Sequence, residues 1–197
     1  MRSAAILIGG RARRLDGRFK PWLPVGDQPI VLRQLKTLAR AGVEHIVLVG
    51  RWSVEERPPK PVIADAVEHA GPLGAVYTAL LVAPENRTLV LAGDMPLVTP
   101  ALVDALFTLG PGEEAVVPRT SDGLHPLCAC YRRSAALRIK ARLDRGELSV
   151  RAALRDLRVR EIAPEEMAVL DPDGMTLMNV NTLADYERAR AIGPQSA

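Results

Sequence analysis

The chain has 197 residues, of which 48% are hydrophobic and 25% are charged, a composition typical of one globular domain with a sizeable core. Its formal net charge is only +3 and 4% of its residues are aromatic, which argues against a nucleic-acid-binding protein, because such proteins need basic faces and stacking side chains. The longest apolar-rich stretch, residues 71–84, is shorter than the roughly 20 residues of a membrane helix, and the apolar start is too short for a signal peptide. We therefore expect a cytoplasmic protein, not bound to a membrane, that binds an anionic small molecule.

Short apolar segments alternate with amphipathic segments over the first 120 residues. The predicted strands are residues 4–10, 45–50, 61–65, 88–96 and 114–119, and the predicted helices are residues 29–42, 71–84 and 99–110. These strands are apolar at nearly every residue, so both faces of their sheet must be covered. The pattern predicts a three-layer α/β/α fold with a mostly parallel, Rossmann-like central sheet.

Three local signals define the predicted helices. In the first helix, Val31, Leu35 and Leu38 have the spacing of one buried face, and Gly42 ends it. The third helix begins at Thr99, a good N-cap residue, followed by proline. For the second helix, we expect four residues to be buried: Leu73, Tyr77, Leu80 and Leu81.

The chain from about residue 121 onward is less regular. We predict strands at residues 125–133, 159–163 and 176–180, and helices at 134–143, 149–157 and 182–193, the last capped by Thr182. No linker rich in glycine and serine precedes this part, so we expect one domain over residues 1–197. Cys128 and Cys130 lie two residues apart on one strand face, and we interpret them as small core residues, not as a metal-binding pair.

Ligands of open α/β sheets bind beyond the carboxyl ends of the strands, so the loops at residues 9–20, 65–74 and 93–96 are candidates. The first loop, GGRARRLDGRFK, matches neither the Walker A pattern nor the dinucleotide-binding pattern. Its glycines permit close approach of backbone N–H groups to a phosphate, and its arginines and lysine would neutralise the remaining charge. A solvated basic loop is the alternative interpretation on composition alone.

Asp94 follows a buried strand and a glycine directly. A carboxylate there is costly to leave unpaired and is well placed to hold a hard cation such as Mg²⁺, although an aspartate at a strand end is often a helix cap or turn residue. A basic loop and this carboxylate at one sheet edge together favour a metal-bound nucleotide as ligand.

The first loop also resembles a family signature. LIGGRARRLDGRFK is similar to the L-A-G-G-x-x-x-R-M-G-x-x-K pattern of nucleotidyltransferases that activate cofactors and sugars. Four later segments are similar to this family in the same order: IADAVEHAGPLGAV, GDMPLVTPALVDAL, HPLCACYRRS and MNVNTLADYERA. The chain most resembles the molybdenum cofactor guanylyltransferases of the MobA type, which have the nucleotide-diphospho-sugar transferase type of fold.

The resemblance implies a transfer of GMP from GTP to the terminal phosphate of molybdopterin, with Mg²⁺ as cofactor and pyrophosphate as the second product. It also implies transient contacts with proteins that deliver or accept the cofactor. Residues 1–120 would bind the nucleotide, and residues 121–192 would bind the second substrate.

The roles that the resemblance implies fall on the following residues. Leu7, Ile8 and Gly9 would line the base and ribose; Gly10, Arg14 and Gly17 would shape the triphosphate loop; Lys20 would contact phosphate; Asp65 would contact the nucleotide; and Asp94 would bind Mg²⁺. Lys20, Arg14 and Asp94 would carry the catalysis. Asn179 and Asn181 would face the pterin, and His125 is a candidate contact to the same substrate, whereas we expect a structural role for His45.

Two residues depart from the signature. Ile8 replaces alanine and narrows the space beside the nucleoside, and Asp16 replaces glycine and brings a carboxylate near the triphosphate. Gly17 could make the turn instead, while Arg13, Arg14 or Arg18 could offset the charge.

Two alternative functions stay open. One is a cytidylyltransferase or sugar-phosphate nucleotidyltransferase of the same superfamily, because the loop recognises phosphate better than base. The other is a nucleotide-binding module without catalysis, which predicts a broken site, although Lys20, Asp65 and Asp94 are all present.

Overall fold

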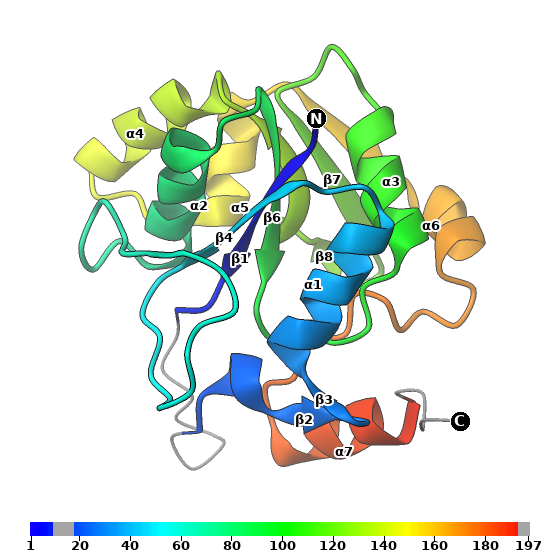
Figure 1. The fold of residues 1–197 in the computed structure, drawn as a ribbon. Coiled ribbons are helices and arrows are strands. Elements are labelled where there is room, and N and C mark those ends of the chain that lie inside the picture. The colour runs from blue at the N-terminus through cyan, green and yellow to red at the C-terminus, as the bar shows by residue number, and fades with distance from the viewer. Residues whose placement is uncertain (10–17, 193–197) are drawn as a thin grey trace.

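The computed structural model describes residues 1–9 and 18–192, in which one large sheet lies between two layers of helices (Figure 1). The strands are β1 (Ser3–Leu7), β2 (Pro24–Val25), β3 (Gln28–Pro29), β4 (His45–Val49), β5 (Val62–Ile63), β6 (Arg87–Ala92), β7 (Ala115–Thr120), β8 (Gly123–Leu124), β9 (Cys128–Arg132) and β10 (Val159–Ile162). The α-helices are α1 (Ile30–Arg40), α2 (Gly71–Val82), α3 (Pro100–Thr108), α4 (Ala135–Asp144), α5 (Val150–Ala153), α6 (Pro164–Leu170) and α7 (Leu183–Ile192), and short 3₁₀ helices are η1 (Lys20–Trp22) and η2 (Leu154–Asp156).

The strand order of the large sheet determines where a ligand can bind. The order is β10-β7-β9-β6-β1-β4-β5, with β8 paired to β7. Strand β1 pairs in parallel with both β4 and β6, whereas β9 runs antiparallel to β6 and β7. The chain proceeds from β1 outward through β4 and β5 and then returns to the other side of β1 as β6. Ligands of such sheets bind at this change of direction, so the loops that follow β1 and β6 frame the expected site.

Two hydrophobic cores cover the two faces of the sheet. Strand β1 contributes to both, because Ala4 and Ile6 belong to one core and Ala5 and Leu7 to the other. The first core contains residues from α1, α3 and α6, and the second contains residues from α2, α4 and α5. Figure 1 shows these helices on opposite sides of the sheet. The predicted three-layer fold with a mostly parallel sheet is confirmed.

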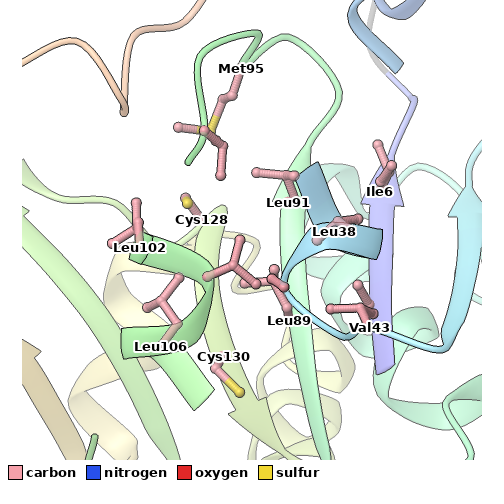
Figure 2. Packing of buried hydrophobic residues seen from close by; sticks show 14 of the residues in the cluster. Ile6, Leu38, Val43, Leu89, Leu91, Met95, Leu102, Leu106, Cys128 and Cys130 are labelled. Atoms are coloured by element: carbon pink, nitrogen blue, oxygen red, sulfur yellow. The ribbon is translucent and has the colours of Figure 1, made fainter. Parts of the chain in front are cut away.

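Figure 2 shows the first core, in which Leu38 of α1 and Leu106 of α3 pack in one cluster with Leu89 of β6. Cys128 and Cys130 belong to the same cluster and form no disulfide. Burial raises the pKa of the Cys128 thiol to about 12 and that of Cys130 to about 11, although nearby arginines lower the latter in part. Both thiols are therefore neutral core groups, as predicted.

Several predicted helix signals are present in the structure. The Thr99 hydroxyl accepts a hydrogen bond from the Leu102 amide at 3.3 Å, and Thr182 accepts one from the Asp185 amide at 3.2 Å. Gly42 follows α1 with φ +70°, the left-handed conformation that glycine adopts without strain. No helix in the described ranges combines the length and apolar character needed to cross a membrane.

The prediction that Leu81 is buried was wrong. Its side chain is 53% exposed, whereas Leu73 and Leu80 are buried. Neighbouring helical residues point about 100° apart, so a helix that packs on the sheet through Leu73, Val76 and Leu80 turns Leu81 to solvent. Tyr77 is partly buried.

The predicted strand at residues 176–180 was also wrong. This segment contains turns, and its backbone amides bond elsewhere: the Thr176 amide donates to the Asp171 carboxylate at 2.9 Å, and the Val180 amide donates to the Asp94 carbonyl at 2.8 Å. Its apolar residues instead enter two cores, Leu177 in the first and Val180 in a small third one with residues of α7 and β2. Four features were not predicted: helix α6, the β2–β3 hairpin, the short strand β8 and the 3₁₀ helix η1.

Candidate active site

A cavity of about 530 Å³ lies beyond the carboxyl ends of β1 and β6. It is lined by nine residues that the sequence singled out: Leu7, Ile8, Gly9, Lys20, Asp65, Asp94, His125, Asn179 and Asn181. Gly10, Arg13, Arg14, Asp16 and Gly17 lie outside the described residues. The structure therefore brings together residues from both halves of the chain at the sheet edge where a ligand was expected.

Lys20, Asp94 and Asn181 form a cluster in this cavity. The Lys20 ammonium donates to Asp94 Oδ2 at 3.2 Å and to Asn181 Oδ1 at 2.7 Å. The side chains of Lys20 and Asp94 are 20% and 22% exposed, so water screens their attraction only in part. The cluster holds both charges where a ligand in the cavity can reach them.

Aromatic packing fixes the backbone around Lys20. This residue begins η1, where the Trp22 amide donates to the Phe19 carbonyl at 3.0 Å. The ring of Trp52 contacts Phe19 and Trp22 edge to face, with ring centroids 5.2 and 5.3 Å apart. Trp52 follows β4, so the loops after β1 and β4 support one another through residues on either side of Lys20 in sequence.

A close backbone approach sets the position of Asp94. The preceding Gly93 donates from its amide to the Leu7 carbonyl at 2.9 Å, and a Cβ atom on Gly93 would lie 2.9 Å from that oxygen. Only glycine permits this contact. Burial raises the pKa of the Asp94 carboxyl, while attraction and hydrogen bonding from Lys20 lower it in part.

The two asparagines reach the cavity because their segment is bonded to the Asp94 turn. Val180, which lies between them in sequence, donates its amide to the Asp94 carbonyl at 2.8 Å. The Asp185 carboxylate accepts a further hydrogen bond, 3.1 Å long, from the backbone N–H of Asn181. A segment 86 residues beyond Asp94 in the chain is thereby held against it.

Asp65 lies on the loop between β5 and α2, which a buried threonine of α2 anchors. The Thr78 hydroxyl accepts from the Ala66 amide at 2.9 Å and donates to the Gly74 carbonyl at 2.8 Å. Partial desolvation at the cavity wall raises the pKa of Asp65. The carboxylate is thus placed by its neighbour's backbone and not by an ion pair of its own among the described residues.

His125 and Arg151 line another part of the cavity. His125 Nε2 is 2.7 Å from the Thr120 hydroxyl. The pKa of His125 lies below its ordinary value, mainly because of burial and further because of Arg151, while Asp122 opposes the shift, so its surroundings favour the neutral imidazole. Arg151 was not among the predicted site residues, because nothing in its local sequence distinguishes it from the other arginines between residues 132 and 160.

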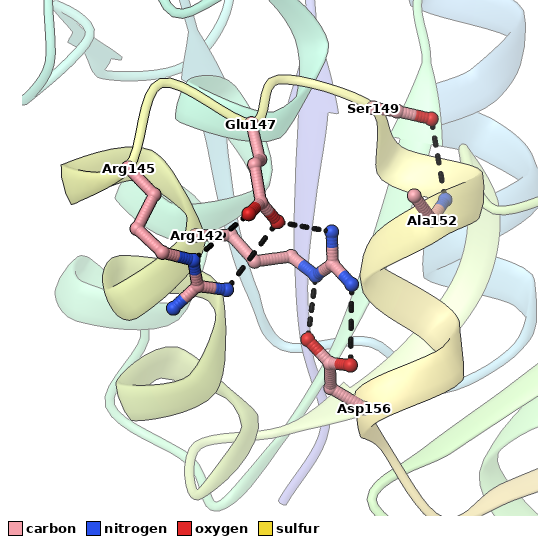
Figure 3. A network of polar contacts seen from close by, with 6 residues as sticks. All are labelled: Arg142, Arg145, Glu147, Ser149, Ala152 and Asp156. Carbon is pink, nitrogen blue, oxygen red and sulfur yellow. Dashed lines mark hydrogen bonds and ion pairs between the residues drawn. The ribbon is translucent and has the colours of Figure 1, made fainter.

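A network of charged residues fixes the turn that precedes Arg151 (Figure 3). Arg142 bonds to Asp156 through two nitrogens, at 2.5 and 3.2 Å, and to Glu147 at 2.6 Å. Hydrogen bonding from Arg142 is the main cause that lowers the pKa of Asp156. The Ser149 hydroxyl accepts from the Ala152 amide at 3.2 Å and caps α5. The network therefore ties α4 to the turn before α5 and to η2 directly after it, and so holds the helix that carries Arg151 from both ends.

The residues present fit a divalent cation held partly by substrate. Within the described ranges, no three His, Cys, Asp or Glu side chains gather into a metal-binding group. Mg²⁺ usually needs only one or two carboxylates, because substrate phosphates and water supply its other ligands. Asp94 provides such a carboxylate, and Asn181 adds an amide oxygen in the same cluster.

Comparison with known proteins identifies the family. The model of the MobA-like NTP transferase domain matches residues 4–161. The chain belongs to this family. It is 33% identical to a probable molybdenum cofactor guanylyltransferase of Methanosarcina mazei, over 94% of this chain and 88% of that protein.

Solved structures agree with this assignment. The molybdopterin-guanine dinucleotide biosynthesis protein A of Archaeoglobus fulgidus is 26% identical with a TM-score of 0.82, over 96% of this chain and 97% of that one. A manganese complex of Rv0371c from Mycobacterium tuberculosis has the same fold, with 24% identity and a TM-score of 0.66, over 96% and 97% of the two chains. The predicted family, fold class and enzyme class are confirmed: this member of the family is a nucleotidyltransferase.

Proposed function

We propose that this enzyme transfers GMP from GTP to the terminal phosphate of molybdopterin and releases pyrophosphate. The observation that carries the proposal is the cluster of Lys20, Asp94 and Asn181, which joins the segment after β1 and the turn after β6 to the asparagine segment. The names of the relatives, molybdenum cofactor guanylyltransferases, support the choice of substrates.

Repulsion between two anionic substrates is the first barrier to this reaction. Lys20 lowers it by placing an ammonium group in the cavity, and we propose that Arg14 assists at the departing pyrophosphate. Asp94 would hold Mg²⁺, which supplies positive charge beside the phosphates when bound. Positioning and electrostatic stabilisation then provide most of the acceleration.

The nucleoside would lie against the end of β1. Leu7, Ile8 and Gly9 present backbone there, and Asp65 faces the same cavity. The side chain of Ile8 is 3% exposed and packs in the first core, so the expected narrowing of the space beside the nucleoside stays a prediction. Gly10 and Gly17 keep their predicted role in the triphosphate loop as part of this proposal.

The second substrate would lie against Asn179, Asn181, His125 and Arg151. Among the described residues that line the cavity, the cations are Lys20 and Arg151, and Lys20 already pairs with Asp94. Arg151 is therefore available for an anionic group of this substrate. A phosphate monoester is ionised near neutral pH, so it needs no general base, which suits the neutral His125. Action in the cytoplasm, the division between residues 1–120 and 121–192, and contacts with delivering or accepting proteins stay predictions.

A pyrophosphate-release assay with molybdopterin and GTP, CTP or ATP tests the proposed reaction. We expect pyrophosphate release with GTP. In Asp94→Asn the rate of release should fall about 100-fold or more, as it does when a group that stabilises transition-state charge is removed. Asp104→Asn is the matched control, because Asp104 is exposed on α3 and pairs with Arg2. Release with CTP alone would overturn the base assignment, and no release with any nucleotide would indicate a non-catalytic binding module.

A further inference from the structure

Gln34 is a buried polar residue on the face of α1 that packs against the sheet. Gln34 is only 1% exposed to solvent. Its amide nitrogen donates to two backbone carbonyls, that of Ala92 at 2.7 Å and that of Met95 at 3.0 Å. These two carbonyls flank Gly93 and Asp94, so one side chain closes the turn that carries the candidate metal ligand.

The other backbone contacts of this turn show how completely it is held. The Gly93 amide donates to β1 through Leu7, and the Asp94 carbonyl accepts from Val180. Gln34 supplies the contacts on the side of α1. The turn thus has one anchor in the sheet, one in the asparagine segment and one in the helix behind it.

Packing alone does not account for a glutamine at this position. Its side-chain oxygen Oε1 is buried and has no hydrogen-bond partner among the described atoms, which is unfavourable. A methionine or leucine would fill the same space without this penalty. The two hydrogen bonds that the amide nitrogen donates are what an apolar side chain cannot replace.

We propose that Gln34 is a positioning residue that fixes the Asp94 turn so that the Asp94 carboxylate holds the metal ion in the productive place. Gln34 does not line the cavity, so it acts through the backbone of the turn and not by contact with substrate. The inference rests on the proposed function, in which Asp94 binds a divalent cation.

Gln34→Met tests the inference, because methionine has a similar length and no donor. Its readouts are Mn²⁺ affinity, measured by electron paramagnetic resonance on the full chain without nucleotide, and the kcat and KM for GTP. We expect the Mn²⁺ affinity to fall about tenfold and kcat to fall about 100-fold, since a displacement near 1 Å has effects of this size. The KM for GTP should change less than about threefold. Gln34→Leu gives the same comparison should Gln34→Met not fold.

Thr88→Val is the matched control. Thr88 is also buried and lies at the other end of β6, where its hydroxyl is 3.1 Å from that of Ser3. We expect this variant to lose stability while Mn²⁺ affinity and kcat stay at the parent values. Equal losses of Mn²⁺ affinity and kcat in Thr88→Val and Gln34→Met would overturn the inference, because they would show a general effect of destabilisation.

Asp94→Asn separates this inference from the proposed function. Unchanged Mn²⁺ affinity in Asp94→Asn would overturn the metal-binding role of Asp94 and the inference with it. A loss in Asp94→Asn, with Mn²⁺ affinity and kcat in folded Gln34→Met within about twofold of the parent, would overturn the role of Gln34 alone.

Discussion

Lys20→Met should change the binding of metal and the binding of nucleotide in opposite directions. The Lys20 ammonium lies 3.2 Å from Asp94 Oδ2 and therefore repels a cation that approaches this carboxylate. The same charge attracts a triphosphate. Without it, we expect bare Mn²⁺ to bind more tightly and GTP to bind more weakly.

The geometry bounds the size of the effect. Two unit charges 3.2 Å apart attract by about 5 kcal/mol at an effective dielectric constant of about 20, and by about 1.3 kcal/mol in water. Lys20 has a second partner in Asn181 at 2.7 Å, so its ammonium group can move away from Asp94 at little cost. The smaller of the two attraction energies is therefore the better guide. About 1.4 kcal/mol corresponds to a gain in Mn²⁺ affinity of about tenfold.

Two titrations measure this prediction. Mn²⁺ binding is followed by paramagnetic resonance at pH 8, because removing Lys20 raises the pKa of Asp94 beyond the rise that burial already causes. GTP binding is followed by fluorescence, since the chain has two tryptophans, Trp22 in the same 3₁₀ helix as Lys20 and Trp52 in contact with Trp22. Lys140→Met is the control, because Lys140 is an exposed lysine of α4 that pairs with Asp144. Weaker Mn²⁺ binding, or unchanged GTP binding, in Lys20→Met would refute the reasoning.

Four further outcomes are expected. Thr78→Val removes the acceptor for the Ala66 amide and should raise the KM for GTP several-fold, whereas Thr78→Ser should match the parent in the same kinetic assay. Arg151→Gln should raise the KM for the second substrate about tenfold, the size of a charge-assisted hydrogen bond, without changing GTP affinity; equal changes in both would contradict the assigned role. By NMR titration His125 should have a pKa below its ordinary 6.5, and Arg151→Gln should raise it. Because the unfolded chain binds that proton first, stability from neutral His125 is present above about pH 6.5 and is lost as the pH falls toward the folded pKa. Leu106→Ala in the core should lower the unfolding free energy by about 2–5 kcal/mol in urea denaturation. A smaller loss would indicate that neighbouring side chains move in to fill the space that the leucine leaves.

Features that depend on neighbouring residues could be predicted from the sequence. The Thr99 cap, the glycine after α1 and the apolar strands are local signals, and the rule that ligands bind beyond parallel strand ends gathered Lys20, Asp65 and Asp94 at one site before the sheet order was known. Lys20 and Asp94 are 74 residues apart, yet both follow strands that prove to be neighbours.

Features that depend on packing between distant segments could not be predicted. Gln34 resembles any polar residue of an amphipathic helix until the turn at Ala92 lies against it. The apolar pattern at residues 176–180 fits a strand, but the amide of Val180 bonds to the Asp94 turn instead. Arg151 reaches the cavity because α5 starts where the Arg142 network places it.

The bond between Val180 and Asp94 also sets the order in which the enzyme becomes complete during synthesis. All strands of the large sheet lie before residue 163, so the sheet can form on a nascent chain that still lacks Asn179 and Asn181. The last helix, α7, packs through Tyr186 against Val25 beside η1, and Figure 1 shows it below the sheet next to β2 and β3. A ribosome-bound chain could thus form its sheet before Asn179 and Asn181 are synthesised, and a protease that cuts near residue 175 would separate both asparagines from the rest of the cavity lining.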